Sequence, residues 1–224
     1  MIETKGSNVT AITVTYNRTV TLKKCIKALL DQTIKPKNII IVDNNSREDE
    51  KQEILLIAEE SSKIHVVFLD ENIGGAGGFE TGMRTAIEKY PADWYWIMDD
   101  DAYPRNDCLE QLLSAANKAG LENVGFVAPL IYGIDYRDYQ YYHHKFLKGA
   151  ALNDTPIAES YEDYNNINKV EANAFVGPLI SKYAVESVGI ADGSLFIYGD
   201  DTEYTYRITR RFPGYMVKSA VIDH

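Results

Sequence analysis

The sequence predicts an α/β fold in which a mostly parallel central sheet is flanked by helices. Strand and helix patterns alternate over roughly the first 130 residues, which is typical of parallel sheets with helical crossovers. Polar or acidic residues directly follow most of these strands. Neither an internal repeat nor a low-complexity linker divides the chain, so residues 1–224 are expected to form a single domain.

The expected strands are short runs of apolar and β-branched residues bounded by polar turns. In the first part of the chain they are Val9–Thr15, Ile39–Val42, Ile64–Leu69, Trp94–Met98 and Val124–Ala128. Residues 131–168 are rich in Tyr, Asn and Asp without firm periodicity, and we expect them to line one side of a cleft. Two further strands are expected at Val170–Val176 and Tyr215–Val217.

Apolar side chains recur at helical spacing between the strands, which predicts helices that pack one face on the sheet. The four stripes are Leu22, Cys25, Ile26, Leu29 and Leu30; Ile54, Leu55 and Ile57; Met83, Ala86 and Ile87; and Leu109, Leu112, Leu113 and Ala116. Shorter helices are expected at Ser181–Val188 and from about Asp201. Ser46, followed three residues later by Asp49, is expected to cap the second helix.

The charge of the chain argues against a nucleic-acid partner. The formal net charge is −10 and the pI is about 4.9, whereas proteins bind phosphate backbones through clustered Lys and Arg. A small phosphate-bearing ligand remains compatible with this charge if a divalent cation mediates the contact.

The sequence contains no recognisable targeting signal and no cysteine motif typical of metal binding or redox chemistry. The N-terminus has no signal-peptide core, and no apolar run approaches the roughly 20 residues that cross a bilayer. We therefore expect a soluble, cytoplasmic domain. Cys25 and Cys108 have no partner at metal-site or redox-motif spacing and are expected to be reduced and structural.

The strongest chemical signal is the acidic run Asp99–Asp101, which directly follows the apolar strand Trp94–Met98. Ligands of open α/β sheets bind outside the carboxyl ends of the strands, and this is such an end. Adjacent carboxylates repel one another unless they are solvated or neutralised, and hard divalent cations prefer oxygen ligands. The run therefore indicates a metal site, although a solvated acidic turn would have the same sequence.

A second acidic cluster, Gly199–Glu203, follows the apolar run Leu195–Tyr198. A carboxylate at this place could remove a proton from an attacking hydroxyl, as a general base does. Acidic residues are also favoured at any helix N-terminus by the helix dipole, so this cluster alone does not decide between the two roles.

A glycine-rich segment, Asn72–Phe79, joins a strand to a helix. Glycines allow the backbone to approach a ligand, and a helix N-terminus favours anions. The segment matches neither the P-loop nor the dinucleotide fingerprint. A tight turn with close helix–sheet packing would require the same glycines.

Polar clusters also follow the first two strands, at Thr15–Arg18 and Asp43–Ser46. An aromatic side chain beside hydrogen-bonding groups suits a nucleobase and ribose, although ordinary strand-to-helix turns look similar. His224, the last residue of the sequence, is an apt ligand for Mn²⁺, but a terminal histidine is often without a role.

Taken together, these segments resemble the inverting family 2 glycosyltransferases. The resemblance rests on TYNR, IIIVDNNS, DENIGGAGGF, WIMDDDA, IYGDDTEY and VIDH, which cover nearly the whole chain in the family's order. It implies the GT-A fold, a nucleotide-binding α/β sandwich. It is nearest to the bacterial rhamnosyltransferases and galactofuranosyltransferases of cell-wall and other cell-surface polysaccharide synthesis.

The resemblance implies a role for each matched residue. The nucleoside would contact Thr15, Tyr16, Arg18 and Asp43, with Asp43 at the base. The donor's ribose and diphosphate would lie against Asn72, Gly75, Gly77, Gly78 and Asp99. Asp99, Asp101 and His224 would bind Mn²⁺ or Mg²⁺. Asp201 would be the catalytic base, with Asp200 supporting it.

The implied reaction is a single displacement that inverts the anomeric carbon. The metal would neutralise the charge that grows on the departing nucleoside diphosphate, while Asp201 deprotonates the attacking hydroxyl. The expected donor is a UDP- or dTDP-linked sugar, galactofuranose or rhamnose, with GGAGGF and the terminal histidine favouring UDP-galactofuranose. The expected acceptor is a glycan or a lipid-linked glycan.

Two other functions are compatible with parts of the pattern. A sugar-nucleotide pyrophosphorylase has a related sandwich, but its glycine-rich loop should follow the first strand, where this chain has Tyr16-Asn17-Arg18. A non-catalytic domain that binds nucleotide-sugar is disfavoured by the two intact acidic clusters. Family members usually continue beyond the position of His224 into a segment that helps bind the acceptor. We expect that segment to be absent, and membrane association to be at most peripheral.

Overall fold

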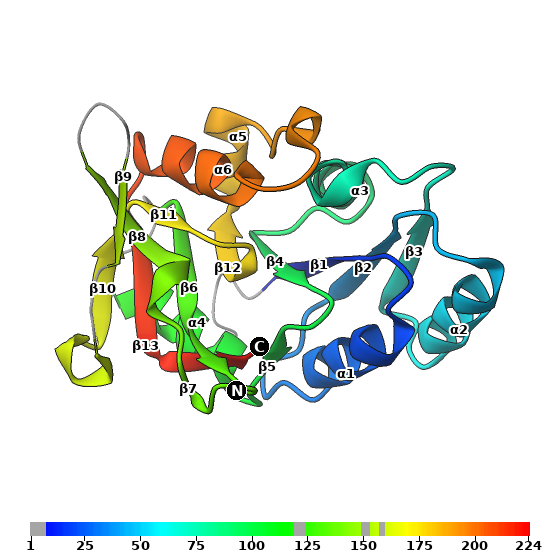
Figure 1. Ribbon diagram of the computed structural model, residues 1–224, viewed down its shortest axis with the longest axis horizontal. Helices are drawn as coiled ribbons and strands as arrows, with labels where there is room; N and C mark the ends of the chain where they lie inside the picture. Colours follow the sequence, from blue (N-terminus) through cyan, green and yellow to red (C-terminus); the bar gives the residue numbers. More distant parts are fainter. Residues whose placement is uncertain (1–7, 119–123, 149–152, 157–159) are drawn as a thin grey trace.

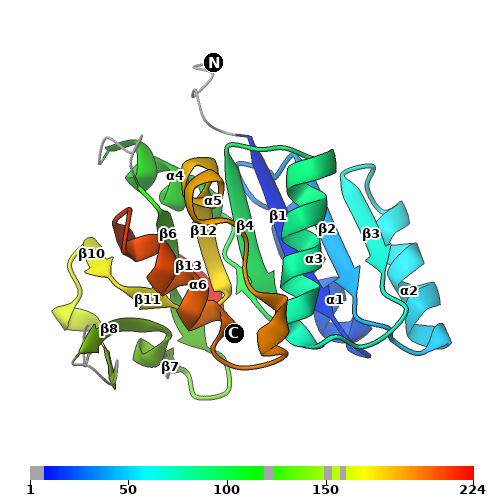
Figure 2. The same cartoon turned by 90° about the horizontal axis from the view of Figure 1, so that it is seen from above.

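The computed structural model describes residues 8–118, 124–148, 153–156 and 160–224 and shows a central sheet with helices on both faces (Figures 1 and 2). The strands of this sheet are β1 (Val9–Thr15), β2 (Asn38–Asp43), β3 (Ile64–Phe68), β4 (Trp94–Asp99), β5 (Tyr103–Pro104), β6 (Phe126–Gly133), β7 (Asp138–Tyr139), β10 (Ile167–Val170), β12 (Val176–Ser181) and β13 (Gly214–Asp223). Eight of them lie side by side in the order β10-β13-β6-β12-β4-β1-β2-β3. The predicted α/β class is confirmed.

The neighbours β4-β1-β2-β3 form a parallel half-sheet. Val14 of β1 pairs with Asp99 of β4, and Thr15 pairs with Asp43 of β2. The strands β1, β2 and β4 therefore end at the same edge of the sheet, which gathers the polar residues that follow them.

The other half of the sheet is mixed. Strand β12 lies antiparallel between β4 and β6, and β13 runs parallel to β6. The short strand β5, which begins two residues after Asp101, pairs antiparallel with the end of β13. This pairing brings His224 from the end of the sequence beside the acidic run.

Six helices in the described ranges cover the sheet: α1 (Thr19–Leu30), α2 (Glu48–Glu59), α3 (Gly74–Lys89), α4 (Cys108–Lys118), α5 (Lys182–Val188) and α6 (Asp200–Thr209). Buried residues of α1, α2 and α4 form one core with one face of the sheet, and those of α3, α5 and α6 form another on the opposite face (Figure 1). None of these helices is long and apolar enough to cross a membrane.

The helical stripes expected from the sequence face the sheet, with two exceptions. Leu22, Cys25, Ile26 and Leu29 of α1 are all buried, as are the members of the α4 stripe. Leu55 and Ile87 are exposed, because they lie at the outer margins of α2 and α3. Cys25 and Cys108 are buried free thiols, which confirms their expected structural role.

The segment expected to be irregular contains short elements: β7, η2 (Tyr141–His143), β8 (His144–Lys148), β9 (Asn153–Pro156) and η3 (Tyr161–Asp163). The strands β8 and β9 form a small second sheet with β11 (Ala172–Asn173). The expected strand Val170–Val176 is wrong, because the chain leaves one sheet after β10, joins the other as β11 and returns as β12. At the break, the Asn173 N–H donates to the Thr205 hydroxyl instead of to a strand of the main sheet.

The expected helix cap at Ser46 is also wrong. Helix α2 begins at Glu48 with Arg47 at its N-cap position. The Ser46 hydroxyl instead accepts a hydrogen bond from the Asn17 N–H at 2.8 Å, and the Ser46 N–H donates to the Asp43 carboxylate. Ser46 therefore ties the turn after β2 to the turn after β1.

Candidate active site

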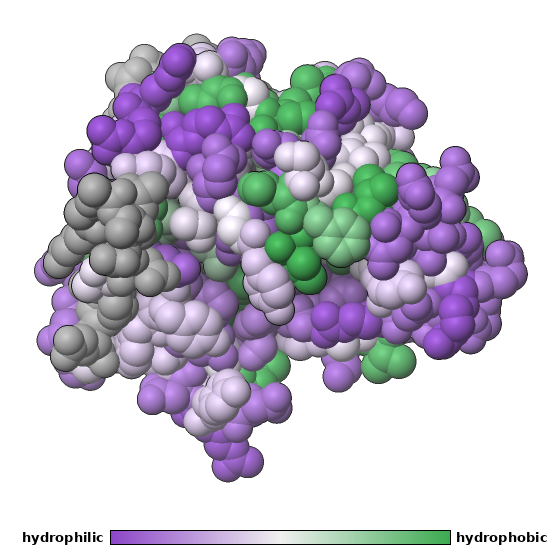
Figure 3. All heavy atoms as spheres, turned by 45° about the horizontal axis from the view of Figure 1, so that its top comes forward, coloured by the Kyte–Doolittle hydropathy of each residue, from purple (hydrophilic) through white to green (hydrophobic). Residues whose placement is uncertain are grey.

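Two adjoining cavities open at the edge where β1, β2 and β4 end. We call them the β1 cavity, of about 320 Å³, and the α6 cavity, of about 410 Å³. Gly75, Phe79, Asp99 and Ile197 line both, so the two form one continuous cleft. Figure 3 shows apolar side chains gathered near the centre of one face among hydrophilic ones. Each volume lies in the range of small-molecule sites.

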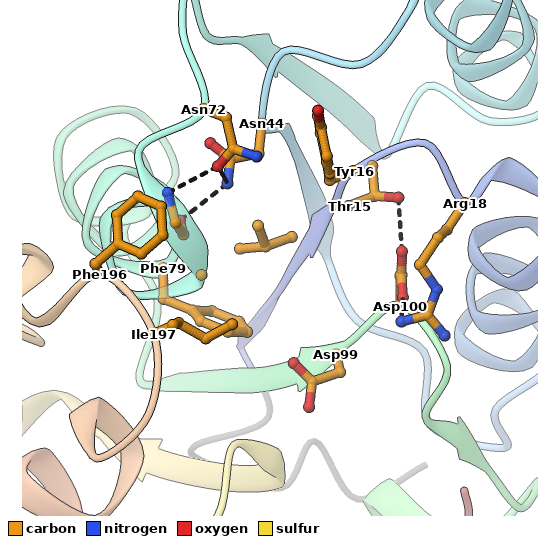
Figure 4. A pocket seen from close by; sticks show the side chains of 13 residues that line it. Thr15, Tyr16, Arg18, Asn44, Asn72, Phe79, Asp99, Asp100, Phe196 and Ile197 are labelled. Atoms are coloured by element: carbon orange, nitrogen blue, oxygen red, sulfur yellow. Dashed lines mark hydrogen bonds and ion pairs between the residues drawn. The ribbon is translucent and has the colours of Figure 1, made fainter.

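The β1 cavity has polar groups on two sides and apolar groups on a third (Figure 4). Thr15, Tyr16 and Arg18 come from the end of β1 and the turn after it, as the sequence predicted. Asn72 and Gly75 lie across the cavity, at the start of α3. This combination of an exposed aromatic ring with amides is chemically suited to a nucleoside.

Asn44 is a cavity residue whose individual role the sequence did not reveal. Its amide nitrogen donates to Asn72 Oδ1 and to the Gly74 carbonyl, each at 3.0 Å (Figure 4). Its Oδ1 accepts from the Ile73 N–H at 3.0 Å. Asn44 thus fixes the loop that leads into α3. Its position inside the polar cluster after β2 was the only signal.

The three consecutive aspartates differ in their partners. Asp99 ends β4 and faces the cleft, whereas Asp100 accepts a hydrogen bond from the Thr15 hydroxyl at 2.7 Å and lies 3.3 Å from Arg18 Nη1. Asp101 pairs with both Arg18 and His224. Asp100, which also lines the β1 cavity, is therefore tied to the end of β1 and to the turn after it.

These partners set the proton affinities of the run. Burial, followed by the neighbouring charge of Asp101, raises the pKa of Asp99 to about 7. Burial raises the pKa of Asp100 to about 6, against the opposing effect of its Thr15 hydrogen bond. Asp101 has a pKa well below its usual range, chiefly because of its hydrogen bond with His224. The pKa of His224 is raised by the same contact.

Asp99, Asp101 and His224 can hold a divalent cation. One ligand atom from each lies within 4.8 Å of the others. Carboxylate oxygens with an imidazole nitrogen are a suitable donor set, and a cation would relieve the repulsion that disfavours charge on Asp99. His224 is held in register, since its N–H donates to the Tyr132 carbonyl and its carbonyl accepts from the Ile134 N–H.

The α6 cavity brings the second acidic cluster to the same cleft. Asp200 and Asp201 begin α6 and line the cavity, together with Asp99 and His224 of the metal-ligand set. Burial, and then the charge of Asp201, raises the pKa of Asp200. Tyr142, His143 and Lys145 form the facing wall, so part of the segment 131–168 does line a cleft as expected. Burial lowers the pKa of His143 to about 3 and keeps its ring uncharged.

The apolar run before the second acidic cluster is an exposed loop. It follows the short helix η4 (Gly193–Leu195), and Phe196 and Ile197 are 53% and 55% exposed. The Phe196 carbonyl accepts a hydrogen bond from the Ala76 N–H in the first turn of α3 at 3.1 Å. This contact places Ile197 between the two cavities. Its apolar side chain therefore lines the cleft instead of packing in the core.

Three expected donor-binding residues do not line either cavity. Asp43 is fully buried, and its carboxylate accepts from the Ser46 N–H. Gly77 and Gly78 are needed for packing, because a Cβ there would collide with Ile73 and Val14 respectively. Their roles in ligand binding stay predictions, whereas Gly74 and Gly75 of the same segment do reach the cleft.

A family model described as glycosyl transferase family 2 matches residues 10–189, which is most of the chain. The chain belongs to this family. The matched range contains every residue that lines the β1 cavity except Phe196 and Ile197.

Two curated relatives extend the family match. Galactofuranosyltransferase GlfT1 of Mycolicibacterium smegmatis is 30% identical over 90% of this chain and 65% of its own length. The dTDP-rhamnosyl transferase RfbF of Shigella flexneri is 28% identical over 90% of this chain and 63% of its own length. The chain thus spans slightly less than two thirds of each.

Among solved structures, GalNAc-T7 with UDP, GalNAc and Mn²⁺ is similar with a TM-score of 0.77, over 97% of this chain and 43% of that one. At 15% identity this likeness shows the fold alone, a GT-A arrangement of sheet and helices.

Proposed function

We propose that this chain is the catalytic domain of an inverting, metal-dependent glycosyltransferase. It would transfer a sugar from a nucleotide-diphosphate donor to a glycan or lipid-linked acceptor in cell-surface polysaccharide synthesis. The observation that carries the proposal is the position of Asp99. It contributes to the three-residue ligand set with Asp101 and His224, and it also lines both cavities, so a donor and an acceptor can meet at the cation.

The β1 cavity is assigned to the donor nucleotide. Tyr16 offers an aromatic face, and Asn72 with Gly75 offers polar backbone and amide groups opposite it. Thr15 and Arg18 hold Asp100, and Arg18 also pairs with Asp101, so these two residues fix the acidic run beside the nucleotide. A bound divalent cation would neutralise charge on the diphosphate, which explains how an acidic protein binds an anionic donor.

The α6 cavity is assigned to the acceptor. Asp201 faces this cavity at the N-terminus of α6 and removes the proton from the acceptor hydroxyl. Asp200 supports it as a neighbouring carboxylate. Ile197 and Phe79, which both cavities share, exclude water from the space between donor and acceptor. A single displacement across this space inverts the anomeric carbon.

The relatives bear on the choice of donor, and the ligand set bears on the choice of cation. GlfT1 is a galactofuranosyltransferase and RfbF uses a dTDP-linked rhamnosyl donor, so UDP-galactofuranose is our first choice and dTDP-rhamnose the second. We favour Mn²⁺ over Mg²⁺, because an imidazole nitrogen joins the carboxylates. We place the domain in the cytoplasm, at the inner face of the membrane when its acceptor is lipid-linked.

The test is calorimetric titration of UDP and dTDP into the purified protein, with and without Mn²⁺, for wild type and Asp101→Ala. Metal-dependent binding that the substitution abolishes supports the donor site, and the preferred base narrows the sugar. If neither nucleotide binds under any condition, the transferase proposal fails. Formation of a nucleotide-sugar from a sugar phosphate and nucleoside triphosphate would instead favour a pyrophosphorylase. Binding without turnover, unaltered by Asp201→Asn, would favour a non-catalytic role.

A further inference from the structure

Two consecutive histidines at the junction of η2 and β8 face opposite ways. His144 is fully buried, with Nδ1 2.6 Å from Asn173 Oδ1, and its Nε2 is sealed from solvent with no hydrogen-bond partner among the described residues. His143 lines the α6 cavity. Its Nε2 lies 2.8 Å from Gln140 Oε1, while in the described part of the chain its Nδ1 has no hydrogen-bond partner. Nδ1 is therefore the ring nitrogen of His143 that remains available to a ligand in this cavity.

Gln140 holds the His143 ring in one orientation and one tautomer. An amide oxygen can only accept a hydrogen bond, so Nε2 carries the proton and the uncharged ring keeps a lone pair on Nδ1. Gln140 is itself anchored, because its backbone N–H donates to the Ile131 carbonyl at 2.9 Å. The Gln140 side chain also lies so close to Gly133 that a Cβ on residue 133 would collide with the Gln140 amide group.

The surroundings of His143 suit a sugar. The neighbouring Tyr142 ring is 58% exposed, and its centroid lies 4.3 Å from that of His143. Asp201 lines the same cavity, and the His143 and His224 rings form a T-shaped pair with 5.7 Å between centroids. An aromatic face beside well-placed hydrogen-bonding groups can hold both the apolar and the hydroxyl-bearing parts of a sugar ring.

We propose that His143 Nδ1 accepts a hydrogen bond from a hydroxyl of a sugar bound in the α6 cavity, with Gln140 as the positioning residue that fixes the required tautomer. This inference rests on the proposed function, since it takes the cavity to be the place of sugar transfer. The hydroxyl can belong to the donor sugar or to the acceptor sugar, which share the same chemistry.

The experiment compares three substitutions of His143. Asparagine places its amide oxygen near the position of Nδ1, glutamine places its polar atoms near Nε2, and phenylalanine keeps only the ring. His65→Gln, on β3 and outside both cavities, is the matched control. Initial rates are measured with Mn²⁺ and whichever of UDP-galactofuranose or dTDP-rhamnose the wild type uses, with octyl β-galactofuranoside or octyl α-rhamnoside as acceptor. Circular dichroism and thermal unfolding check that each variant folds.

We expect His143→Phe and His143→Gln to lose about 10- to 100-fold in kcat/KM, as expected for a hydrogen bond lost in a site built around it. His143→Asn should recover most of that loss, and Gln140→Leu should show an intermediate loss. A donor-sugar contact would weaken binding of the nucleotide-sugar but not of the free nucleoside diphosphate, and would slow donor hydrolysis without acceptor. An acceptor contact would raise only the acceptor KM.

The inference is overturned if folded His143→Phe and His143→Gln keep wild-type kinetics for both substrates. It is also overturned if His143→Asn is no better than His143→Phe. A wild-type protein that binds no nucleotide would overturn the proposed function itself. A wild type that transfers sugar normally, beside unaffected His143 variants, would overturn this inference alone.

Discussion

His224 Nε2 lies 3.4 Å from Asp101 Oδ1, although the two residues come from opposite halves of the chain. The contact depends on β5, which begins two residues after Asp101 and pairs with the end of β13 through Ile222. The imidazole thereby completes a three-residue ligand set that the acidic run alone would not provide. The order of strands in the sheet, and not proximity in sequence, creates the candidate metal site.

Removing one member of this set should abolish metal-dependent nucleotide binding. Asp101→Asn and His224→Ala should each weaken Mn²⁺ affinity by at least about 100-fold, since even loss of a residue behind a ligand costs about 10- to 100-fold. Calorimetric titration of Mn²⁺ in the presence of UDP measures this. Asp223→Asn is the control, because its carboxylate pairs with Arg105 at 2.8 Å and lies outside the set. Unchanged affinity in both ligand variants would exclude this metal site.

Asp201→Asn should reduce turnover without affecting donor binding. A general base contributes about 10²- to 10⁴-fold to rate, so kcat should fall by that factor while the Kd for UDP with Mn²⁺ stays at the wild-type value. Steady-state kinetics and calorimetry on the same preparation separate the two effects. Glu203→Gln is the control on the same helix, as Glu203 pairs with Arg207 and lines neither cavity. A larger loss in Asp200→Asn than in Asp201→Asn would transfer the base role to Asp200.

Periodicity was enough to predict the first half of the sheet and the gathering of its polar ends. The runs at β1, β2 and β4 are short, apolar and separated by helices, and parallel strands of that kind must end at one edge. Thr15 therefore reaches the acidic run, and its hydroxyl bonds Asp100. The contact between Arg18 and the same run follows from its position in the turn after β1.

Hydrophobic periodicity could not reveal the features of the site that depend on long-range contacts and on backbone geometry. Leu195–Tyr198 has the composition of a strand, but Phe196 and Tyr198 have φ values of 58° and 70°, which no strand allows. The loop is held by Ala76, far away in the sequence, so no local signal marks it. His143 likewise lies in a segment without periodicity, and its hydrogen bond to Gln140 and its contact with the distant His224 ring have no local signal in the sequence.

Burial of His144 should make the stability of the protein depend on pH in a defined window. Burial lowers its pKa to about 4 in the folded state, below the value near 6.5 of an exposed histidine. The unfolded chain thus binds the proton more readily, so this stabilising contribution is complete above about pH 6.5 and is lost as the pH falls toward 4. The loss is on the order of 3 kcal/mol.

Chemical denaturation of wild type and His144→Gln at several pH values tests this. The free energy of unfolding of the wild type should fall more steeply between pH 6.5 and 4 than that of the variant. The carboxylates titrate in both proteins, so the difference between the wild-type and variant pH profiles gives the contribution of His144 alone. Parallel pH profiles would contradict the assignment of a neutral, buried His144.

Alanine substitutions at the two adjacent glycines that begin α3 should have different effects, one on stability and the other on donor binding. Gly74 has φ of +77°, and a Cβ there would collide with the Phe196 backbone, whereas a Cβ on Gly75 would meet nothing within 4 Å. Gly74→Ala should therefore lower stability by about 1–3 kcal/mol and lower Tm by several degrees. Gly75→Ala should leave Tm unchanged but weaken binding of the nucleotide donor, because Gly75 lines both cavities. Thermal unfolding and UDP titration of the two variants measure both effects. Wild-type donor affinity in a folded Gly75→Ala protein would mean that the diphosphate does not approach the first turn of α3.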